Sequence, residues 1–313
     1  MPVGFGLAAS HAPNVFIPPD KWEMRYKAAI ADIPPPPQVK DETPEVRAEI
    51  GRRIETAFGV LRDKLAAYRP DALVMVTDDH DEMFDSKLIN PQIAIFLGKR
   101  GLGLMNLTDR KTLDDPTAEP IVLQCHEELS QFIATGLVQR DFDIAVSRQE
   151  ETRSVGEVDR GMGHGFTRTS PRIMPELDIP VVLIWLNCYF EPLPTAKRCL
   201  DLGRAVADVC ASRPERIAIL GTGGLSHDPR GPRAGWIDEP LDRAVLDAFA
   251  AGDPYRLESL YKIPSDTYHG GTGEIRSWLA VGGAMGDAKA TIVDYIAAYH
   301  IITGVGFAYW ETE

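Results

Sequence analysis

Cysteine is scarce in this chain, with four residues among 313. No two of them form a Cys-x-x-Cys pair, the spacing that metal sites and redox motifs commonly use. The last three lie in an apolar segment and in the helical pattern that follows it; the four are Cys125, Cys188, Cys199 and Cys210. We therefore expect buried, reduced thiols and neither disulfides nor a zinc–thiolate site.

Long apolar runs and an excess of basic residues are also missing. No apolar run approaches the about 18 residues that span a bilayer, and no basic segment precedes the short apolar stretch at residues 3–9, as it would in a secretory leader. Asp and Glu outnumber Lys and Arg by 46 to 33, for a formal net charge of −13. This excess of negative charge disfavours nucleic acids and anionic membrane surfaces as binding partners. We expect a soluble cytoplasmic protein that acts on a small molecule.

What the chain does contain is an alternation of apolar segments with helical patterns. The apolar segments are typical of strands that are covered on both faces of a sheet, and they occupy residues 3–10, 71–79, 92–98, 142–147, 181–189, 216–224 and 300–310. The clearest helix begins after Thr43, an N-cap residue, and ends at Pro70. Further helices are expected at 120–134, 195–211, 240–250, 274–282 and 289–299. The pattern predicts one α/β domain over residues 1–313, with a central mostly parallel or mixed sheet flanked by helices.

Proline is abundant, with 24 residues, and it clusters in the stretch IPPPPQ at residues 33–38. Fixed φ angles and missing N–H donors exclude a helix or a central strand there. We expect residues 18–43 to form a surface insertion that could serve as a lid.

Four of the seven histidines stand out by their position. His11, His80 and His227 each follow the carboxyl end of a predicted strand, and His164 lies in the glycine-rich stretch RGMGHGF. In an open α/β sheet this edge is where ligands bind. Imidazole is the commonest transition-metal ligand, and two histidines with one carboxylate are typical of non-haem Fe(II) oxygenases.

Several acidic residues could supply the carboxylate. One of them is Glu274, which opens a helical pattern after a glycine-rich approach, where backbone can come close to a ligand and the helix terminus favours an anion. The others surround His80 and could orient its ring or be solvated loop charges; they are Asp78, Asp79, Asp81 and Glu82.

Six stretches together resemble one enzyme family, in the same order along nearly the whole chain. They are SHAP, DDHDEMF, GHGF, GTGGLSHDPRGPRAG, GTGEIRSWLAVGGAM and YHI, and the fourth is the most specific. The family is the class III extradiol ring-cleavage dioxygenases, and the resemblance is strongest to the catalytic (beta) subunits of protocatechuate 4,5-dioxygenases. It implies an active site at the C-terminal edge of the strands.

Residue roles follow from this resemblance. His11, His80 and Glu274 match the metal ligands, with Fe(II) as the expected ion. His227 matches the acid/base of the family, and His164 matches a second catalytic histidine that contacts substrate or oxygen.

The substrate side of the site is expected to include two hydroxyl residues before His227 and two arginines after it. An arginine that faces the pocket would suit a carboxylated substrate. Near the C-terminus, Thr303 stands where the family has a serine-containing stretch. The predicted substrate-binding residues are Thr222, Ser226, Arg230, Arg233 and Thr303.

The resemblance also bears on partners. Relatives with a small helical subunit use it to cap the pocket, whereas here the insertion at residues 18–43 would do so. We expect a homo-oligomer, most simply a dimer, that binds a catecholic substrate and O2 and contacts neither nucleic acid nor membrane.

The leading hypothesis is a ferrous extradiol dioxygenase that opens the ring of a protocatechuate-, gallate- or methylgallate-like acid. Alternatives are a 2-aminophenol-type ring-cleaving dioxygenase and a Zn-dependent hydrolase that uses the same histidines to activate water. A non-catalytic binding protein on the same scaffold is a further alternative. His227 disfavours it, because binding alone has little need of a proton carrier.

Overall fold

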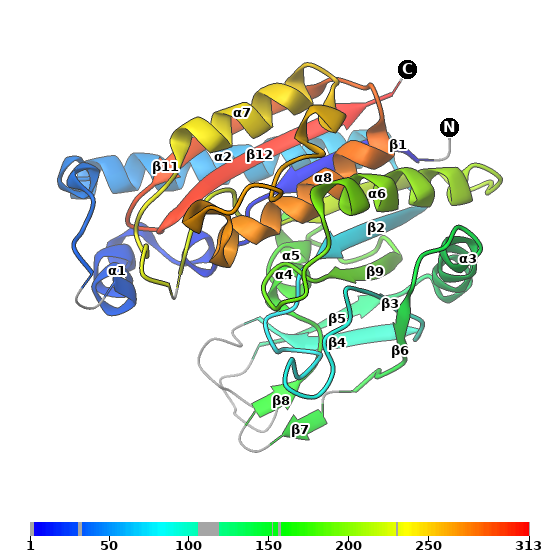
Figure 1. Ribbon diagram of the computed structural model, residues 1–313. Coiled ribbons are helices and arrows are strands. Elements are labelled where there is room, and N and C mark those ends of the chain that lie inside the picture. The colour runs from blue at the N-terminus through cyan, green and yellow to red at the C-terminus, as the bar shows by residue number, and fades with distance from the viewer. Residues whose placement is uncertain are drawn as a thin grey trace.

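The computed structural model describes residues 3–30, 33–105, 119–151, 153–155, 158–229 and 231–312. Within these residues, the centre is an eight-stranded sheet with strand order β11-β12-β1-β10-β2-β9-β3-β6 (Figure 1). Its strands are β1 (Val3–Ala9), β2 (Ala72–Thr77), β3 (Ile93–Phe96), β6 (Ala145–Ser147), β9 (Val181–Leu186), β10 (Ile217–Thr222), β11 (Ala290–Ala298) and β12 (Thr303–Glu311). The prediction of an α/β fold with a mixed sheet is confirmed.

Four neighbouring strands at the centre of the sheet, β1, β10, β2 and β9, run parallel to one another. Every residue of these four strands is buried. The sheet becomes antiparallel on both sides of them, where β12 pairs with β1 and β3 pairs with β9. The four parallel strands therefore end at one edge of the sheet, which brings the loops that follow them together.

Helices cover both faces of this sheet (Figure 1). The residues of β2 alternate between the two cores that result: Val74 and Val76 face one, and Leu73 and Met75 face the other. The first core includes α3 (Glu127–Val138), α6 (Ala196–Cys210), α7 (Glu239–Ala250) and α8 (Ile275–Met285), and the second includes α2 (Pro44–Tyr68), α4 (His164–Thr167) and α5 (Ser170–Ile173). Burial on both faces explains why the central strands read as continuous apolar segments.

The boundaries of α2 follow from its sequence. The Thr43 hydroxyl accepts a hydrogen bond from the Val46 N–H, and Pro44 occupies the first turn. At the other end, Arg69 adopts a left-handed conformation with φ of 53°, before Pro70. The predicted helix is confirmed at both ends.

Two of the helix predictions were wrong. The helix predicted at 289–299 is instead strand β11 (Ala290–Ala298), because β-branched residues such as Thr291, Ile292 and Val293 fit a pleated edge paired with β12. Residues 120–134 are divided: β5 (Pro120–Gln124) pairs with β4 (Arg100–Leu104), and α3 begins only at Glu127. The His126 ring caps α3 by accepting from the Leu129 N–H.

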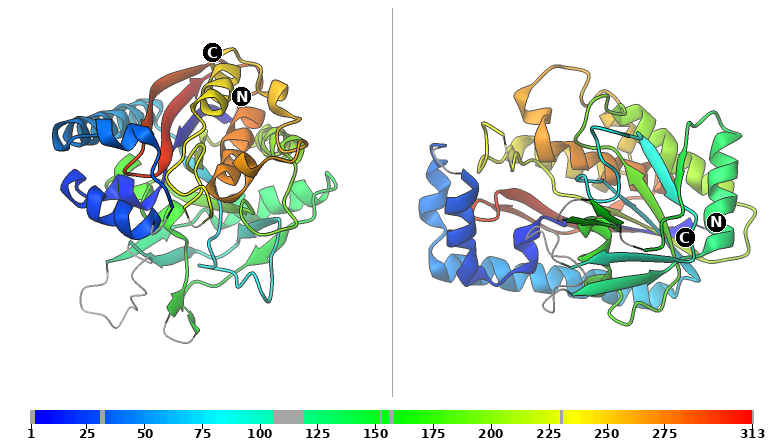
Figure 2. Two further views of the ribbon diagram at one scale, coloured as in Figure 1. Left: turned by 60° about the vertical axis from the view of Figure 1, so that its left-hand side comes forward. Right: turned by 90° about the horizontal axis from the view of Figure 1, so that it is seen from below.

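The insertion at residues 18–43 contains more helix than we predicted. It holds η2 (Pro19–Lys21), α1 (Trp22–Ile30) and η3 (Pro37–Asp41), and it lies beside one end of α2 (Figures 1 and 2). Proline is compatible with η3 because Pro37 occupies its first position, where an N–H is not needed. The remaining short elements are η1 (Pro13–Phe16), β7 (Arg153–Val155), β8 (Val158–Arg160), η5 (Pro254–Leu257), η6 (Asp266–Tyr268) and η7 (Gly270–Glu274).

The first and last described strands lie side by side, since the Thr312 N–H bonds to the Gly4 carbonyl (Figure 2). All four cysteines are free; Cys188, Cys199 and Cys210 are buried as predicted, and Cys125 is half-buried. Across the described part of the chain, the helices are too short or too polar to cross a bilayer.

Candidate metal centre

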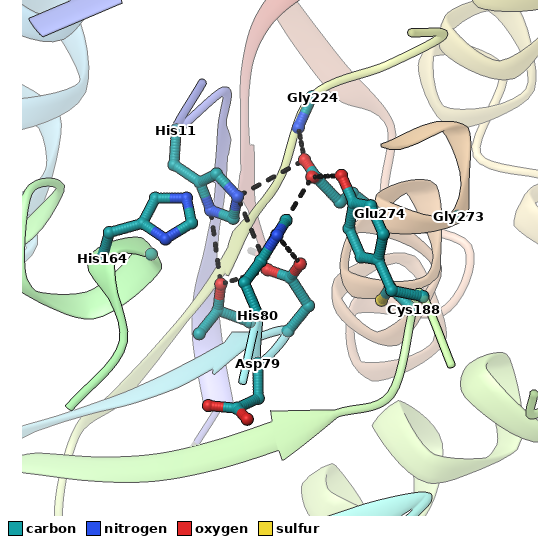
Figure 3. Close-up of polar contacts among 12 residues, drawn as sticks. His11, Asp79, His80, His164, Cys188, Gly224, Gly273 and Glu274 are labelled. Atoms are coloured by element: carbon teal, nitrogen blue, oxygen red, sulfur yellow. Dashed lines mark hydrogen bonds and ion pairs between the residues drawn. The ribbon is translucent and has the colours of Figure 1, made fainter. Parts of the chain in front are cut away.

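The predicted site residues meet at the carboxyl end of the four parallel strands. His11 follows β1, His80 follows β2, and His227 follows β10. Glu274 is the last residue of η7, immediately before α8. Figure 3 shows Glu274 and His164 on opposite sides of His11 and His80. Segments from both ends of the sequence thus supply one cluster.

The cluster has the spacing of a metal site. His11 Nε2 lies 3.3 Å from Glu274 Oε2, and His80 Nε2 lies 3.6 Å from Glu274 Oε1. Ligand atoms of His11, Asp78, His80 and Glu274 all lie within 4.8 Å of one another. Both histidine Nε2 atoms are buried without a partner in hydrogen-bonding geometry. A transition-metal ion between these nitrogens and the carboxylate would supply the partner that they lack. These residues therefore fit a divalent cation.

Hydroxyl groups hold the His11 ring from the side away from the cluster. Its Nδ1 lies 3.0 Å from Thr222 Oγ1 and 3.3 Å from Thr77 Oγ1. The Thr222 hydroxyl can direct its hydrogen to Thr77 or to the Gly165 carbonyl, so we assign the Nδ1 proton of His11 to Thr222. This tautomer leaves Nε2 free to bind a metal.

Glu274 is fixed by two donors as well as by the histidines. Its Oε2 accepts from the Gly224 N–H at 2.5 Å, and its Oε1 accepts from the Tyr189 hydroxyl at 2.6 Å. Burial opposes ionisation, but the charges of His227 and His11 hold the pKa of Glu274 well below its ordinary value. Burial likewise disfavours a charged His80, yet contact with Asp78 raises the pKa of that ring well above its ordinary value. The centre therefore contains Glu274 in its ionised form.

His227 touches the cluster but is not part of it. Its Nδ1 donates to the Leu225 carbonyl at 2.8 Å, which leaves Nε2 directed at Glu274 Oε1, 3.3 Å away. Burial disfavours the charged ring, but Glu274 outweighs it and raises the pKa of His227. A Cβ at Gly271 would overlap the His227 ring, so glycine is required for this close approach.

His164 is hydrogen-bonded to Glu82 beside the cluster. Its Nδ1 lies 2.8 Å from Glu82 Oε1, and its ring centroid lies 4.8 Å from that of His11 and 4.9 Å from that of His80. Burial lowers the pKa of His164. At Glu82, burial opposes ionisation, but contact with His164 outweighs it and lowers the pKa of that carboxyl to about 2. His11, His80 and His164 form a second set of three groups that could hold a metal.

Two residues near the centre were missed or left undecided by the sequence analysis. Tyr189, which follows β9, carried no signal beyond its place after a strand. Asp78 was one of four acidic candidates around His80, and the alternation of β2 could not separate it from Asp79. The Asp79 carboxylate points away from the cluster and caps the backbone of Met83 and Phe84 (Figure 3).

The predicted substrate-binding residues are distributed more widely. Thr222 and Ser226 are buried, and their hydroxyls bond to protein groups, Ser226 to the Asp242 carboxylate at 2.9 Å. Thr303 is buried, and its methyl group lies with the His227 ring against Gly224. Arg233 is half-buried and donates to Thr267 Oγ1 at 2.7 Å. Arg230 lies outside the described residues.

Comparisons with known proteins agree with this geometry. The family described as "Catalytic LigB subunit of aromatic ring-opening dioxygenase" matches residues 33–309. The chain is 30% identical over 189 residues to a gallate dioxygenase from Pseudomonas putida, covering 58% of this chain and 52% of that protein. It is 25% identical over 196 residues to a 2,3-dihydroxyphenylpropionate/2,3-dihydroxicinnamic acid 1,2-dioxygenase from Photorhabdus laumondii, covering 62% of this chain and 55% of that protein.

The chain thus spans about half the length of these curated relatives. A solved structure from Escherichia coli K12, the uncharacterized protein JW3007, has the same fold with a TM-score of 0.52. It is 15% identical, and the match covers 97% of this chain and 99% of that one. The family match extends over most of the chain and includes every residue of the cluster except His11, which lies before it. The chain belongs to the LigB family of catalytic subunits of aromatic ring-opening dioxygenases.

Proposed function

We propose that this protein is an Fe(II)-dependent extradiol dioxygenase that opens the ring of a catecholic acid with O2. The observation that carries the proposal is the convergence of His11 Nε2, His80 Nε2 and the Glu274 carboxylate at the carboxyl end of parallel strands. Two imidazoles and a carboxylate with open positions are the ligand set of non-haem Fe(II) oxygenases.

The three ligands would hold the ion, and the ion would bind the catechol oxygens and O2 and acidify the bound phenol. The protein's own contribution begins with ligand orientation. Thr222 and Thr77 hold His11, and Tyr189 with the Gly224 N–H hold Glu274. These groups fix the direction of each ligand before substrate arrives.

Proton transfer falls to His227 in this proposal. Because the Leu225 carbonyl holds its Nδ1 proton, Nε2 is the atom that takes a proton from the catechol and later returns it. Contact with Glu274 favours the protonated form once the proton has been taken. His164, held by Glu82, would lie beside the substrate or oxygen as a second catalytic histidine.

Substrates of the protocatechuate, gallate or methylgallate type suit the region around His227. Arg233 and Trp236 line a small pocket with His227 and three aspartates (Asp228, Asp238 and Asp266), and the Arg233 guanidinium is the group there that could pair with a substrate carboxylate. The named substrates of two relatives, gallate and 2,3-dihydroxyphenylpropionate, are both catecholic acids. Thr222 and Ser226 position the metal ligand and the His227 loop in this proposal, and Thr303 remains a candidate substrate contact.

The insertion at residues 18–43 is proposed as a lid within a single domain. Tyr26 and Ile30 of α1 pack against Ile302 and Gly235, which belong to the segments that carry Thr303 and His227. The Glu42 carboxylate anchors the end of the insertion by accepting from the His300 N–H at 2.8 Å. Such a lid would replace a separate capping subunit, and we propose that the chain acts as a homodimer in the cytoplasm.

The test is a panel of catecholic acids, with 2-aminophenol and an aryl ester added, mixed with iron-loaded protein first without O2 and then with it. We expect O2 uptake equal to ring-opened product with catecholic acids only. Turnover of 2-aminophenol in preference to catechols would favour the 2-aminophenol-type alternative, and absence of any O2-dependent product would overturn the proposal.

One observation favours a second candidate, a Zn-dependent hydrolase. His11, His80 and His164 form a three-histidine set, which catalytic zinc sites also use. However, the family to which the chain belongs is one of ring-opening dioxygenases. Ester hydrolysis without O2 by zinc-loaded protein would support this candidate.

A further inference from the structure

The four acidic residues around His80 have different surroundings. Asp79 and Asp81 accept hydrogen bonds from backbone N–H groups of their own loop, and Glu82 is paired with His164. Asp78 is the exception. It is 1% exposed, and its Oδ2 has no partner in hydrogen-bonding geometry. A buried carboxylate oxygen in this state calls for a cation.

The contacts of Asp78 lie on the inner side of both histidines. Its Oδ1 is 3.5 Å from His11 Nε2, and its Oδ2 is in contact with His80 Nε2. These are the same nitrogens that face Glu274. A carboxylate that merely orients a ligand histidine accepts from the ring nitrogen that does not bind metal. On His11, Thr222 contacts Nδ1, the nitrogen that faces away from the cluster, whereas Asp78 contacts Nε2.

We propose that Asp78 is a fourth protein ligand, so that the resting site has two histidines and two carboxylates. This inference rests on the proposed function, which supplies the divalent ion. With a dication and two neutral imidazoles, the negative charges of Asp78 and Glu274 would bring the net charge of the ion and its ligands to zero. A site with Glu274 alone would keep one positive charge. The second carboxylate shifts the donor set toward oxygen, which suits Mn²⁺ as well as Fe²⁺.

The number of ligands has a consequence for substrate binding. An ion that takes six ligands would have two positions left beside four protein ligands, whereas two catechol oxygens and O2 would need three. Asp78 would therefore have to leave the ion if the substrate binds through both oxygens. Its Oδ1 already accepts from the Thr77 hydroxyl at 3.2 Å, a partner that remains available to the released carboxylate.

The experiment compares Asp78→Asn with Asp81→Asn in the full chain. Both changes remove one negative charge from the same loop. Asparagine at position 81 keeps an oxygen for the Ser86 N–H and tolerates the φ of 62° found there. Mn²⁺ affinity is measured by titration for wild type and both variants, and circular dichroism checks the fold. A crystal structure of Mn²⁺-loaded wild type without substrate measures the distance from the ion to the Asp78 oxygens.

We expect an Asp78 oxygen within about 2.4 Å of Mn²⁺. We also expect Asp78→Asn to weaken Mn²⁺ binding by at least about 100-fold, beyond the loss typical of an outer partner, with Asp81→Asn within about threefold of wild type. An Asp78 oxygen beyond about 3 Å, or equal affinities in the two variants, would overturn the inference. If wild type still cleaves catechols in that case, the proposed function survives; if wild type binds no divalent ion, both fail.

Discussion

The Tyr189 hydroxyl donates a 2.6 Å hydrogen bond to Glu274 Oε1, and the Tyr189 ring centroid lies 4.1 Å from that of His80. One side chain from the loop after β9 thus contacts two residues proposed to hold the metal. Its effect on the site comes through their orientation, since it restricts both a carboxylate and an imidazole.

Tyr189→Phe should weaken metal binding by about 10- to 100-fold, because Glu274 loses a donor that fixes its orientation. Metal titration measures this. Tyr255→Phe is the matched control, since its hydroxyl only reaches Asp201 at 3.4 Å, in another part of the fold. Metal affinity equal to wild type in Tyr189→Phe would show that the hydrogen bond does not position the ligand.

Alanine at His11, His80 or Glu274 should each abolish iron retention and turnover while the fold remains intact. The reason is that each change removes one donor from a small ligand set. Metal analysis with circular dichroism measures the outcome, and His269→Ala, at an exposed position, serves as the control. Full iron occupancy in any one variant would remove that residue from the ligand set.

His227→Phe should retain iron and bind a catechol but lose turnover by about 10²- to 10⁴-fold, the range of general acid–base catalysis. Stopped-flow absorbance after O2 is added to the anaerobic complex should show a slowly decaying species, since proton transfer becomes limiting. Loss of iron from this variant would instead indicate that His227 is a metal ligand. Unchanged turnover would show that His227 is not the proton carrier.

Replacing both Tyr26 and Ile30 by alanine tests the lid. These side chains pack against Ile302 and Gly235, so their loss should loosen α1 and raise KM for a catecholic acid by about 10-fold, with a smaller change in kcat. Met24→Ala on the same helix is the control, because Met24 is 62% exposed. A KM and kcat equal to those of wild type would show that the insertion does not act as a lid.

Asp242 should make stability depend on pH. Burial raises the pKa of this carboxyl to about 6, although the hydrogen bonds that it accepts from Ser226 and Tyr295 lower it. Because the folded pKa exceeds the unfolded one, the native state holds the proton more tightly between about pH 4 and pH 6, and this contribution is lost as pH rises through 6.

The free energy of unfolding of wild type, measured relative to Asp242→Asn, should therefore fall by about 1 to 3 kcal/mol from pH 4 to pH 6.5. Denaturant titrations at several pH values measure it. A difference that stays constant across this range would mean that Asp242 is ionised throughout.

Much of the fold follows from local sequence patterns. The central strands were predictable because burial on both faces makes them continuously apolar, and α2 was predictable from Thr43, Pro44 and its helical periodicity. β11 was not, since most of its residues are half-buried at the sheet edge and its short sequence shows no strict alternation of apolar and polar residues.

The site was predictable in part, and for a different reason. His11, His80, His227 and Glu274 carry recognisable motifs, and the sheet brings them together. Tyr189 has no such signal, and the stretch DDHDEMF contains Asp78 without separating it from Asp79. The roles of both residues depend on distances between loops that are far apart in sequence. Only the three-dimensional arrangement distinguishes Asp78 from Asp79.

Strand β1 (Val3–Ala9) lies between β10 (Ile217–Thr222) and β12 (Thr303–Glu311), and both of these neighbours are far from it in the sequence. Both pairings join segments that are far apart in the sequence, and closing such long loops has an entropic cost that local contacts do not have. The pairing of β1 is therefore a late event in folding. Capture of a metal by His11 and Glu274, as we propose, would require this pairing, so metal binding would report that β1 has taken its place in the sheet.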